Sequence, residues 1–337
     1  MKIDLHTHII PPDIPNYAKK FGYGDFIHLD HDPTTCTACM MKGPERFRVI
    51  ESNCWDVEKR LEECNKDGVS VQVLSTIPVL FNYWAKPEHA SETSKYINDH
   101  LAQVVSEHPT RFIALGTVPL QETQLACFEM ERAVKKLGMP GIEIGSNVNG
   151  RNLDDPALDE FWATAQDLGA SIFIHPWDMM ARDRMSKYWT PWLVGMMAET
   201  ALAYCSLTMG GVLDKYPDLK ICFAHGGGSF PATIGRIDHG FNVRPDLCQT
   251  DSQSLPSSWL KKIYIDSLVH DEDALKLLIK KVGVQRIALG TDYPFPLGEH
   301  RPGALIEKMS HLTQDQRSWL NYKSALAFLG LDEKHYL

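Results

Sequence analysis

The stretch 111–118 reads RFIALGTV, a nearly continuous run of apolar and β-branched residues. Such a run is typical of a strand that is covered on both faces, as in a parallel sheet flanked by helices. Four further stretches have the same character: VSVQVLST (69–76), ASIFIHP (170–176), KICFAHG (220–226) and RIALGTD (286–292). The repeated pattern predicts a parallel sheet of buried strands.

Eight strands in all are expected when the chain is followed outward from these runs. They are residues 2–9, 70–76, 112–119, 141–146, 171–176, 220–226, 263–268 and 286–292. Helical periods separate them, for example at 57–66, 91–107, 125–137, 156–168 and 271–282. Eight β–α units predict an α/β fold of the (β/α)8 or TIM-barrel type, in which the parallel strands close on themselves inside a ring of helices.

The chain of 337 residues is longer than the roughly 250 that such a barrel needs. Residues 10–54 directly follow the first strand, contain several prolines and show no long helical period. An insertion at this point would cover the carboxyl-end mouth of the barrel, where active sites lie. We therefore expect one domain, 1–337, with a small insertion at 10–54 and a final helix at 314–329.

The composition excludes several classes of protein. Lys and Arg total 34 against 43 Asp and Glu, a net charge of −9, whereas a nucleic-acid binder needs a basic face. No apolar run reaches the roughly 18–20 residues of a membrane span. The first ten residues, MKIDLHTHII, do not resemble a signal peptide. We expect a cytosolic protein with no nucleic-acid or membrane partner.

The eight cysteines are scattered along the chain, as reduced thiols of a cytosolic protein usually are. Cys36 and Cys39 form a C-x-x-C pair. A zinc site would need further ligands, and a redox motif would need a strand before it and a helix after it. We interpret the pair as part of a plain loop.

Five polar residues lie at the carboxyl ends of expected strands. His6 and His8 are two apart on the first strand and so face the same side, where a barrel interior normally holds apolar residues. His175, His225 and Asp292 end three other strands and converge on the same mouth. A set of three imidazoles and a carboxylate favours a divalent metal, zinc first, over buried hydrogen-bonded histidines; iron, cobalt and manganese remain alternatives.

His225 differs from the others because three glycines follow it. Small residues bring the backbone close to whatever binds there. His225 is either a further ligand or a general acid/base beside a metal-bound water, and the second role suits its pKa range.

Arginines and aromatic residues supply candidate substrate contacts. Arg46 and Arg48 are two apart and would share a face on a strand; the guanidinium fork suits carboxylates, with Lys42 a weaker candidate. The stretch 187–200, KYWTPWLVGMMAET, contains Trp192 and fits core packing and pocket lining equally well.

These motifs together resemble the decarboxylase branch of the amidohydrolase superfamily. The likeness is carried by DLHTH (4–8), HP (175–176), AHGGG (224–228) and GTDYPFP (290–296), and it extends over residues 1–331. Tryptophan- and arginine-containing stretches make it more specific, and the likeness is greater still to members that act on 2-amino-3-carboxymuconate 6-semialdehyde. The residues that depart from the family pattern are 30–43.

The resemblance implies a non-oxidative decarboxylase with one zinc ion per chain. His6, His8, His175 and Asp292 would hold the zinc, and His225, together with Asp292, would act in catalysis on the bound water. Such an enzyme produces 2-aminomuconate 6-semialdehyde in the kynurenine branch of tryptophan catabolism and so limits quinolinate formation and NAD synthesis.

The resemblance also implies how a dicarboxylate substrate would be held. Arg48 and Arg244 would grip its carboxylates, with Arg244 reaching across from the other subunit of a homodimer, and Trp192 would line the pocket.

Three other functions fit parts of the pattern. The nearest is a related metal-dependent decarboxylase of an aromatic acid. A second is a metal-dependent amide or lactone hydrolase, although the expected fourth strand has no lysine at its end and its Glu143 lies inside the strand, which favours a single metal. A third is a barrel that binds metal or a partner without catalysis, although a structural site would be closed by four ligands.

Overall fold

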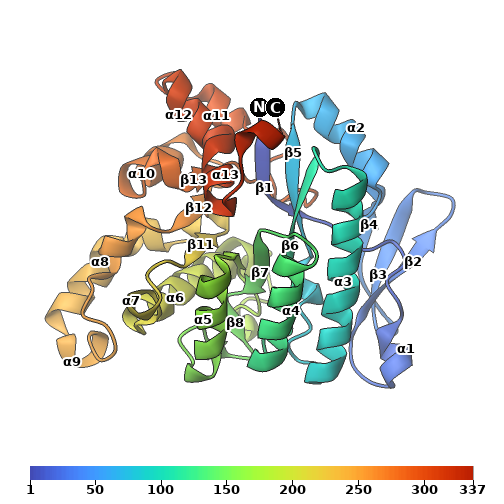
Figure 1. The fold of residues 1–337 in the computed structure, drawn as a ribbon, viewed down its shortest axis with the longest axis horizontal. Helices are drawn as coiled ribbons and strands as arrows, with labels where there is room; N and C mark the ends of the chain where they lie inside the picture. The colour runs from blue at the N-terminus through green and yellow to red at the C-terminus, as the bar shows by residue number, and fades with distance from the viewer. Residues whose placement is uncertain (337) are drawn as a thin grey trace.

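The structure, a computed structural model, describes residues 1–336. Its centre is an eight-stranded parallel sheet in which neighbouring strands follow the order of the chain (Figure 1). The strands are β1 (Ile3–His8), β5 (Val71–Ser75), β6 (Phe112–Gly116), β7 (Gly141–Gly145), β10 (Ser171–His175), β11 (Lys220–Phe223), β12 (Tyr264–Asp266) and β13 (Ile287–Ala288). The eight expected strands are confirmed, each shorter than predicted.

Hydrogen bonds between β1 and the segment after β13 close this sheet. The amide of Asp292 donates to the carbonyl of His6 at 2.8 Å, and the amide of His8 donates to the carbonyl of Tyr293 at 2.7 Å. The closed ring confirms the expected barrel.

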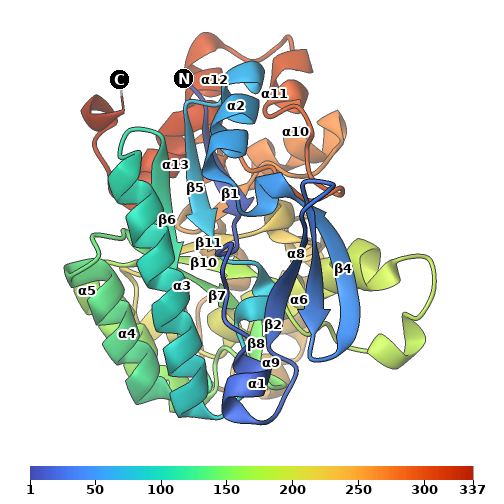
Figure 2. The ribbon, with the colours of Figure 1, turned by 90° about the vertical axis from the view of Figure 1, so that its right-hand side faces the viewer.

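Helices surround the barrel, and Figure 2 shows α3, α4 and α5 side by side along its outside. The longer helices are α2 (Val57–Asp67), α3 (Pro87–Glu107), α4 (Thr123–Lys135), α5 (Asp159–Leu168), α6 (Met196–Met209), α8 (Phe230–Val243) and α10 (Glu272–Lys281). The shorter ones are α1 (Tyr17–Phe21), α7 (Val212–Lys215), α9 (Pro245–Cys248), α11 (Ala304–Lys308), α12 (Gln314–Ser318) and α13 (Ser324–Leu329). A π-helical segment, Trp319–Lys323, joins α12 to α13, so the expected final helix is interrupted in its middle.

Helix α2 illustrates how local sequence places these elements. The Asp56 side chain caps it by accepting from the amides of Glu58 and Lys59, and Gly68 ends it in the left-handed conformation at φ +71°. The chain then enters β5 directly, and β5 pairs with β1.

The inner residues of the strands form an apolar cluster with α13. Its members include Ile3, Leu5, Val71, Val73, Ile113, Leu115, Phe173 and Phe328. The pairing of β1 with β5 shifts register between Asp4 and Thr7, a bulge of one residue on β1. Beyond this bulge the interior of the barrel becomes polar, with His6 and His8 fully buried.

The segment 10–54 contains a small antiparallel sheet of its own, seen beside α3 in Figure 1. Its strands are β2 (Ile27–Asp32), β3 (Thr37–Lys42) and β4 (Glu45–Glu51). Cys36 lies in the turn between β2 and β3, but Cys39 lies within β3, so the plain-loop interpretation is wrong for the second cysteine. All eight cysteines are free thiols. The remaining strands, β8 (Asn147–Val148) and β9 (Arg151–Asn152), form a two-residue ladder after β7.

The described helices lack the character of membrane spans. None within residues 1–336 combines the length and the apolar character that crossing a bilayer requires.

Candidate metal centre

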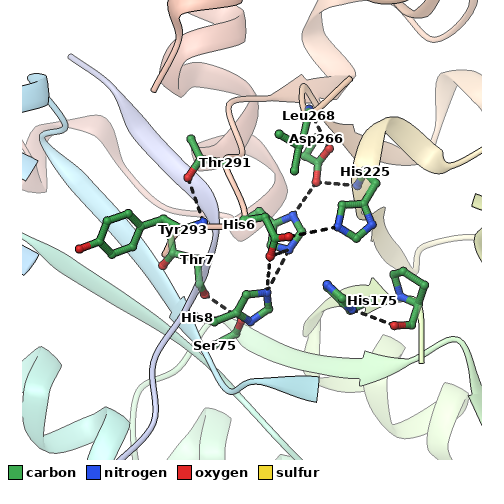
Figure 3. Close-up of polar contacts among 12 residues, drawn as sticks. His6, Thr7, His8, Ser75, His175, His225, Asp266, Leu268, Thr291 and Tyr293 are labelled. Atoms are coloured by element: carbon green, nitrogen blue, oxygen red, sulfur yellow. Dashed lines mark hydrogen bonds and ion pairs between the residues drawn. The ribbon is translucent and has the colours of Figure 1, made fainter. Parts of the chain in front are cut away.

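The imidazoles of His6, His8, His175 and His225, labelled in Figure 3, meet the carboxylate of Asp292 at the carboxyl ends of the barrel strands. His6 and His8 come from β1, His175 ends β10, and His225 and Asp292 follow β11 and β13. The ring centres of His6, His8 and His175 lie 5.1–5.2 Å apart, and that of His225 lies 5.1 Å from His6 and 5.0 Å from His175. The structure therefore brings together all five residues that the sequence singled out for this site.

Backbone and carboxylate acceptors fix the orientation of three of these rings. His8 Nδ1 donates to the carbonyl of Thr76 at 2.8 Å, and His175 Nδ1 donates to the carbonyl of Pro176 at 3.0 Å. His6 Nδ1 donates to Asp266 Oδ2 at 2.8 Å. Because Nδ1 carries the proton in each ring, a neutral imidazole has its lone pair on Nε2, the atom that faces the site.

The atoms that face the site lie at distances that suit a shared cation. His6 Nε2 is 3.1 Å from His8 Nε2, and Asp292 Oδ1 is 3.1 Å from His8 Nε2 and 3.5 Å from His6 Nε2. His175 Nε2 is buried and has no hydrogen-bond partner within residues 1–336. Ligand bonds of about 2.1 Å in a tetrahedral site separate ligand atoms by about 3.4 Å. The unpaired Nε2 of His175, beside this cluster, is what a site for a metal ion that accepts its lone pair would leave.

Another set of possible ligand atoms, one from each of His6, His175, His225 and Asp292, has all its members within 4.8 Å of one another. This set includes His225, so the geometry is compatible with both of its roles considered above, further ligand and acid/base.

The charges of the site suit a metal as well. Burial is the main cause that lowers the pKa of His6 and, with the neighbouring His225, holds that of His175 well below its usual range. Burial opposes ionisation of Asp292, but the neighbouring imidazoles of His225 and His8 hold its pKa well below the usual range. Burial would lower the pKa of His8, but Asp292 and Glu143 raise it. The pKa shifts of His6, His175 and Asp292 favour the neutral imidazoles and the ionised carboxylate that bind a metal, whereas the shift of His8 favours its protonated form.

Asp266 belongs to this site, although the sequence analysis did not identify it. Its buried carboxylate accepts from His6 Nδ1, from the amides of His225 and Gly226 at 2.8 and 2.7 Å, and from that of Leu268 at 3.0 Å. Burial alone would raise the pKa of Asp266, but these donors lower it. The only clue in the sequence was that Asp266, like the other candidates, lies in the last part of an expected strand, 263–268.

The backbone turn at His225 depends on its glycines. His225 has φ +54° and Gly226 has φ +61°. A Cβ on Gly226 would lie 2.3 Å from Val269 Cγ1, so Val269 would have to move, and the positive φ of Gly226 would strain any other residue. The turn leaves His225 Nδ1 without a partner in the described chain and places Nε2 3.8 Å from Asp292 Oδ2.

A cavity of about 560 Å³ opens above the cluster. His8, His175 and Asp292 form part of its floor, and the segment 10–54 contributes residues from β3 and β4. Its walls include Met40, Lys42, Phe47, Arg48, Trp177, Trp189, Trp192 and Phe295. The structure thus places two of the predicted substrate contacts, Arg48 and Trp192, in the same cavity as three of the predicted ligands.

Arg48 is the cation of this cavity that is free to bind an anion. Lys42 pairs with Asp25 at 3.3 Å and Arg182 with Asp178 at 3.5 Å, whereas Arg48 has no such partner within residues 1–336. Its guanidinium carbon lies 5.8 Å from the ring centre of Trp192 and 5.7 Å from that of Phe295. Burial lowers its pKa.

Arg46 does not accompany Arg48 into the cavity. The pairing of β3 with β4 skips one residue, because Met40 faces Arg48 while Met41 faces Arg46. This bulge at Phe47 breaks the regular alternation of sides. Phe47 and Arg48 line the cavity, and Arg46 remains exposed.

Arg244 lies away from this cavity. It follows α8, its side chain is 57% exposed, and it forms an ion pair with Asp246 at 2.7 Å. A role for Arg244 at a metal centre therefore requires the centre of another chain.

Glu143 faces the site from inside β7. Its Oε1 lies 3.9 Å from His8 Nδ1, and burial raises its pKa to about 8. Neither carboxylate oxygen has a hydrogen-bond partner in the part of the chain described.

Comparison with known proteins shows close relatives over the full length. The family model described as "Amidohydrolase" matches residues 3–331. The 2-amino-3-carboxymuconate-6-semialdehyde decarboxylase of Dictyostelium discoideum is 55% identical over 100% of this chain and 94% of its own length. The enzyme of the same name from Caenorhabditis elegans is 40% identical over 98% of this chain and 95% of its own.

A solved structure supports the fold at lower identity. The 5-carboxyvanillate decarboxylase of Novosphingobium aromaticivorans, in complex with manganese and 4-hydroxy-3-methoxy-5-nitrobenzoic acid, is 21% identical. It superposes with a TM-score of 0.81 over 98% of this chain and 96% of that one.

Proposed function

Because the chain belongs to the amidohydrolase family, we propose that it is a metal-dependent carboxy-lyase that decarboxylates 2-amino-3-carboxymuconate 6-semialdehyde. The products are 2-aminomuconate 6-semialdehyde and CO₂. Identity of 55% and 40% to two enzymes named for this reaction, over nearly the whole of each chain, is the observation that carries the proposal.

The metal that we propose is zinc, one ion per chain. His6, His8 and His175 would offer Nε2 and Asp292 a carboxylate oxygen, a donor set that suits zinc. When bound, zinc supplies a Lewis acid that draws electron density from an oxygen of its ligand or substrate.

His225 would carry the proton that the reaction needs. Loss of CO₂ leaves an electron pair on carbon, and a proton must reach that carbon. His225 is nearly buried, has a free Nδ1 among the described residues, and is held at its backbone amide by Asp266. The Asp292 carboxylate, whose Oδ2 lies 3.8 Å from His225 Nε2, would act on this ring through its charge.

Arg48 and the aromatic walls would bind the substrate. The unpaired guanidinium suits a carboxylate in a bidentate contact. Trp192 and Phe295 flank it and present flat faces to a planar conjugated acid. These rings also exclude water from the carboxylate that leaves, which strengthens the electrostatic contacts in the cavity.

We further propose that the protein acts as a homodimer in which Arg244 serves the partner's cavity. Arg244 is exposed and distant from its own cavity. Exposed apolar residues on the same elements and near them, namely Leu193, Val194, Leu202, Val243 and Leu247, would be covered by a second copy.

The place of the reaction in the cell follows from the substrate. We expect the enzyme in the cytosol, in the kynurenine branch of tryptophan catabolism, where it would divert its substrate from quinolinate.

The direct test is anaerobic CO₂ release from 2-amino-3-carboxymuconate 6-semialdehyde with no added organic cofactor. Matched assays use 2,6-dihydroxybenzoate and a simple lactone. CO₂ from the semialdehyde alone supports the proposal, CO₂ from the benzoate alone assigns an aromatic-acid decarboxylase, and lactone hydrolysis alone assigns a hydrolase.

A further inference from the structure

A buried arginine beneath the cavity joins two segments that meet at the metal centre. Arg60 lies on α2 and is fully buried. Its Nη1 donates to the carbonyl of His8 at 2.7 Å and to that of Asn53 at 3.0 Å, and its Nη2 donates to Thr7 Oγ1 at 3.2 Å. One side chain therefore holds β1 to the end of the insertion.

The same guanidinium lies against the loop that carries Asp292. Its carbon is 4.7 Å from the ring centre of Tyr293, the next residue, at the distance of a cation–π contact. Tyr293 is itself fixed, because its hydroxyl donates to Glu63 Oε2 at 2.5 Å and its carbonyl accepts from the amide of His8. Figure 3 shows its ring pointing away from the imidazoles, so Arg60 acts from behind the site.

No carboxylate within residues 1–336 pairs with the charge of Arg60. All its hydrogen bonds go to uncharged oxygens, and its Nε has no partner among residues 1–336. A buried charge costs free energy, and an apolar residue of similar size often stabilises a protein more. Space filling alone therefore does not explain an arginine here.

The contacts of Arg60 do explain it. The carbonyls of His8 and Asn53, from two segments of the chain, both accept from Nη1 while the guanidinium plane lies against Tyr293. Only a planar group with several N–H donors can make these contacts at the same time. Asn53 comes two residues after β4, the strand that carries Arg48. The guanidinium thus contacts the backbone of the candidate ligand His8 and the ring of Tyr293, which follows the candidate ligand Asp292. It also contacts the segment just after β4, the strand that carries Arg48.

We propose that Arg60 is a positioning residue of the metal centre, which sets the separation of His8 and Asp292 and ties the insertion to it. This inference rests on the proposed metal centre. If Arg60 is such a residue, changes at Arg60 should alter both the affinity for the metal and the position of Arg48, although Arg60 itself contacts neither the metal nor the substrate.

The test compares Arg60→Lys with Arg111→Lys in the full-length protein. Arg111 also donates to backbone carbonyls, those of Ser70 and Val69, but at the start of β5, away from the site. The readouts are zinc affinity by competition with a chelating dye, and the visible absorption spectrum after cobalt replaces zinc. We expect Arg60→Lys to weaken zinc binding by about 10–100-fold and to alter the cobalt spectrum, as loss of an outer support does. Arg111→Lys should change neither.

A second pair of variants covers the case in which Arg60→Lys does not fold. Tyr293→Leu removes the ring under the guanidinium, whereas Tyr293→Phe keeps it and loses only the hydroxyl. Weaker zinc binding in Tyr293→Leu alone supports the proposal. Wild-type affinity and spectrum in Arg60→Lys, or in Tyr293→Leu, overturn it. A wild-type protein that binds no zinc would instead refute the metal centre itself.

Discussion

His6 Nδ1 lies 2.8 Å from Asp266 Oδ2, and both side chains are fully buried in the barrel. The carboxylate fixes the tautomer of the imidazole and points its Nε2 at the other ligand atoms. Since Asp266 also accepts from the amide of His225, one buried group orients a proposed ligand and the proposed acid/base.

Asp266→Asn should weaken zinc binding by about 10–100-fold, because the amide no longer favours the His6 tautomer with a bare Nε2. Zinc titration of the metal-free protein measures this. Glu129→Gln is the control, since Glu129 is another buried carboxylate but pairs with Arg132 outside the barrel. Equal zinc affinity in the Asp266 variant and the wild type would contradict the role of Asp266.

His225→Ala should keep its zinc and lose catalysis. Removing a general acid/base typically lowers kcat by about 10²–10⁴-fold, whereas the three other imidazoles still hold the metal. Metal content by mass spectrometry and CO₂ release are measured on the same sample. Full turnover with full zinc content would contradict the acid/base role of His225, and loss of zinc would instead assign His225 as a metal ligand.

Arg48→Lys should raise KM for the semialdehyde more than it lowers kcat. A lysine keeps the charge but cannot make the bidentate contact, which is worth about 1.5–3 kcal/mol, or roughly 10–100-fold. Arg46→Lys on the same strand is the matched control, since Arg46 is exposed and outside the cavity. If both substitutions change KM equally, the assignment of Arg48 fails.

Arg244→Ala and His225→Ala should each be inactive but complement one another when mixed after subunit exchange. In a mixed dimer, one cavity has an intact His225 and receives Arg244 from the other chain. Random exchange then restores about a quarter of wild-type activity. No recovery from a sample shown to contain mixed dimers would place Arg244 outside the neighbouring cavity.

The sequence was sufficient to predict the barrel because its strands are apolar runs separated by helical periods. It also singled out five polar residues that the structure brings together, namely His6, His8, His175, His225 and Asp292, since parallel strands end at one mouth and polar residues there stand out. The roles of these residues stay predictions until the variants above are measured.

Three features could not be predicted. Asp266 is one acid on a short strand, and its four donors come together only in three dimensions. Arg60 lies on an amphipathic helix, where an arginine is usually solvent-exposed. The three-stranded sheet in 10–54 and its bulge at Phe47 follow from pairing between strands, which local patterns do not encode.

The proposed decarboxylation depends on a metal that His6, His8, His175 and Asp292 would hold. The most direct measurement follows CO₂ release from the semialdehyde during stepwise return of zinc to chelator-treated protein. We expect no release from the stripped enzyme and a linear rise that stops at one zinc per chain. Undiminished CO₂ release from protein shown to contain no metal would contradict the account.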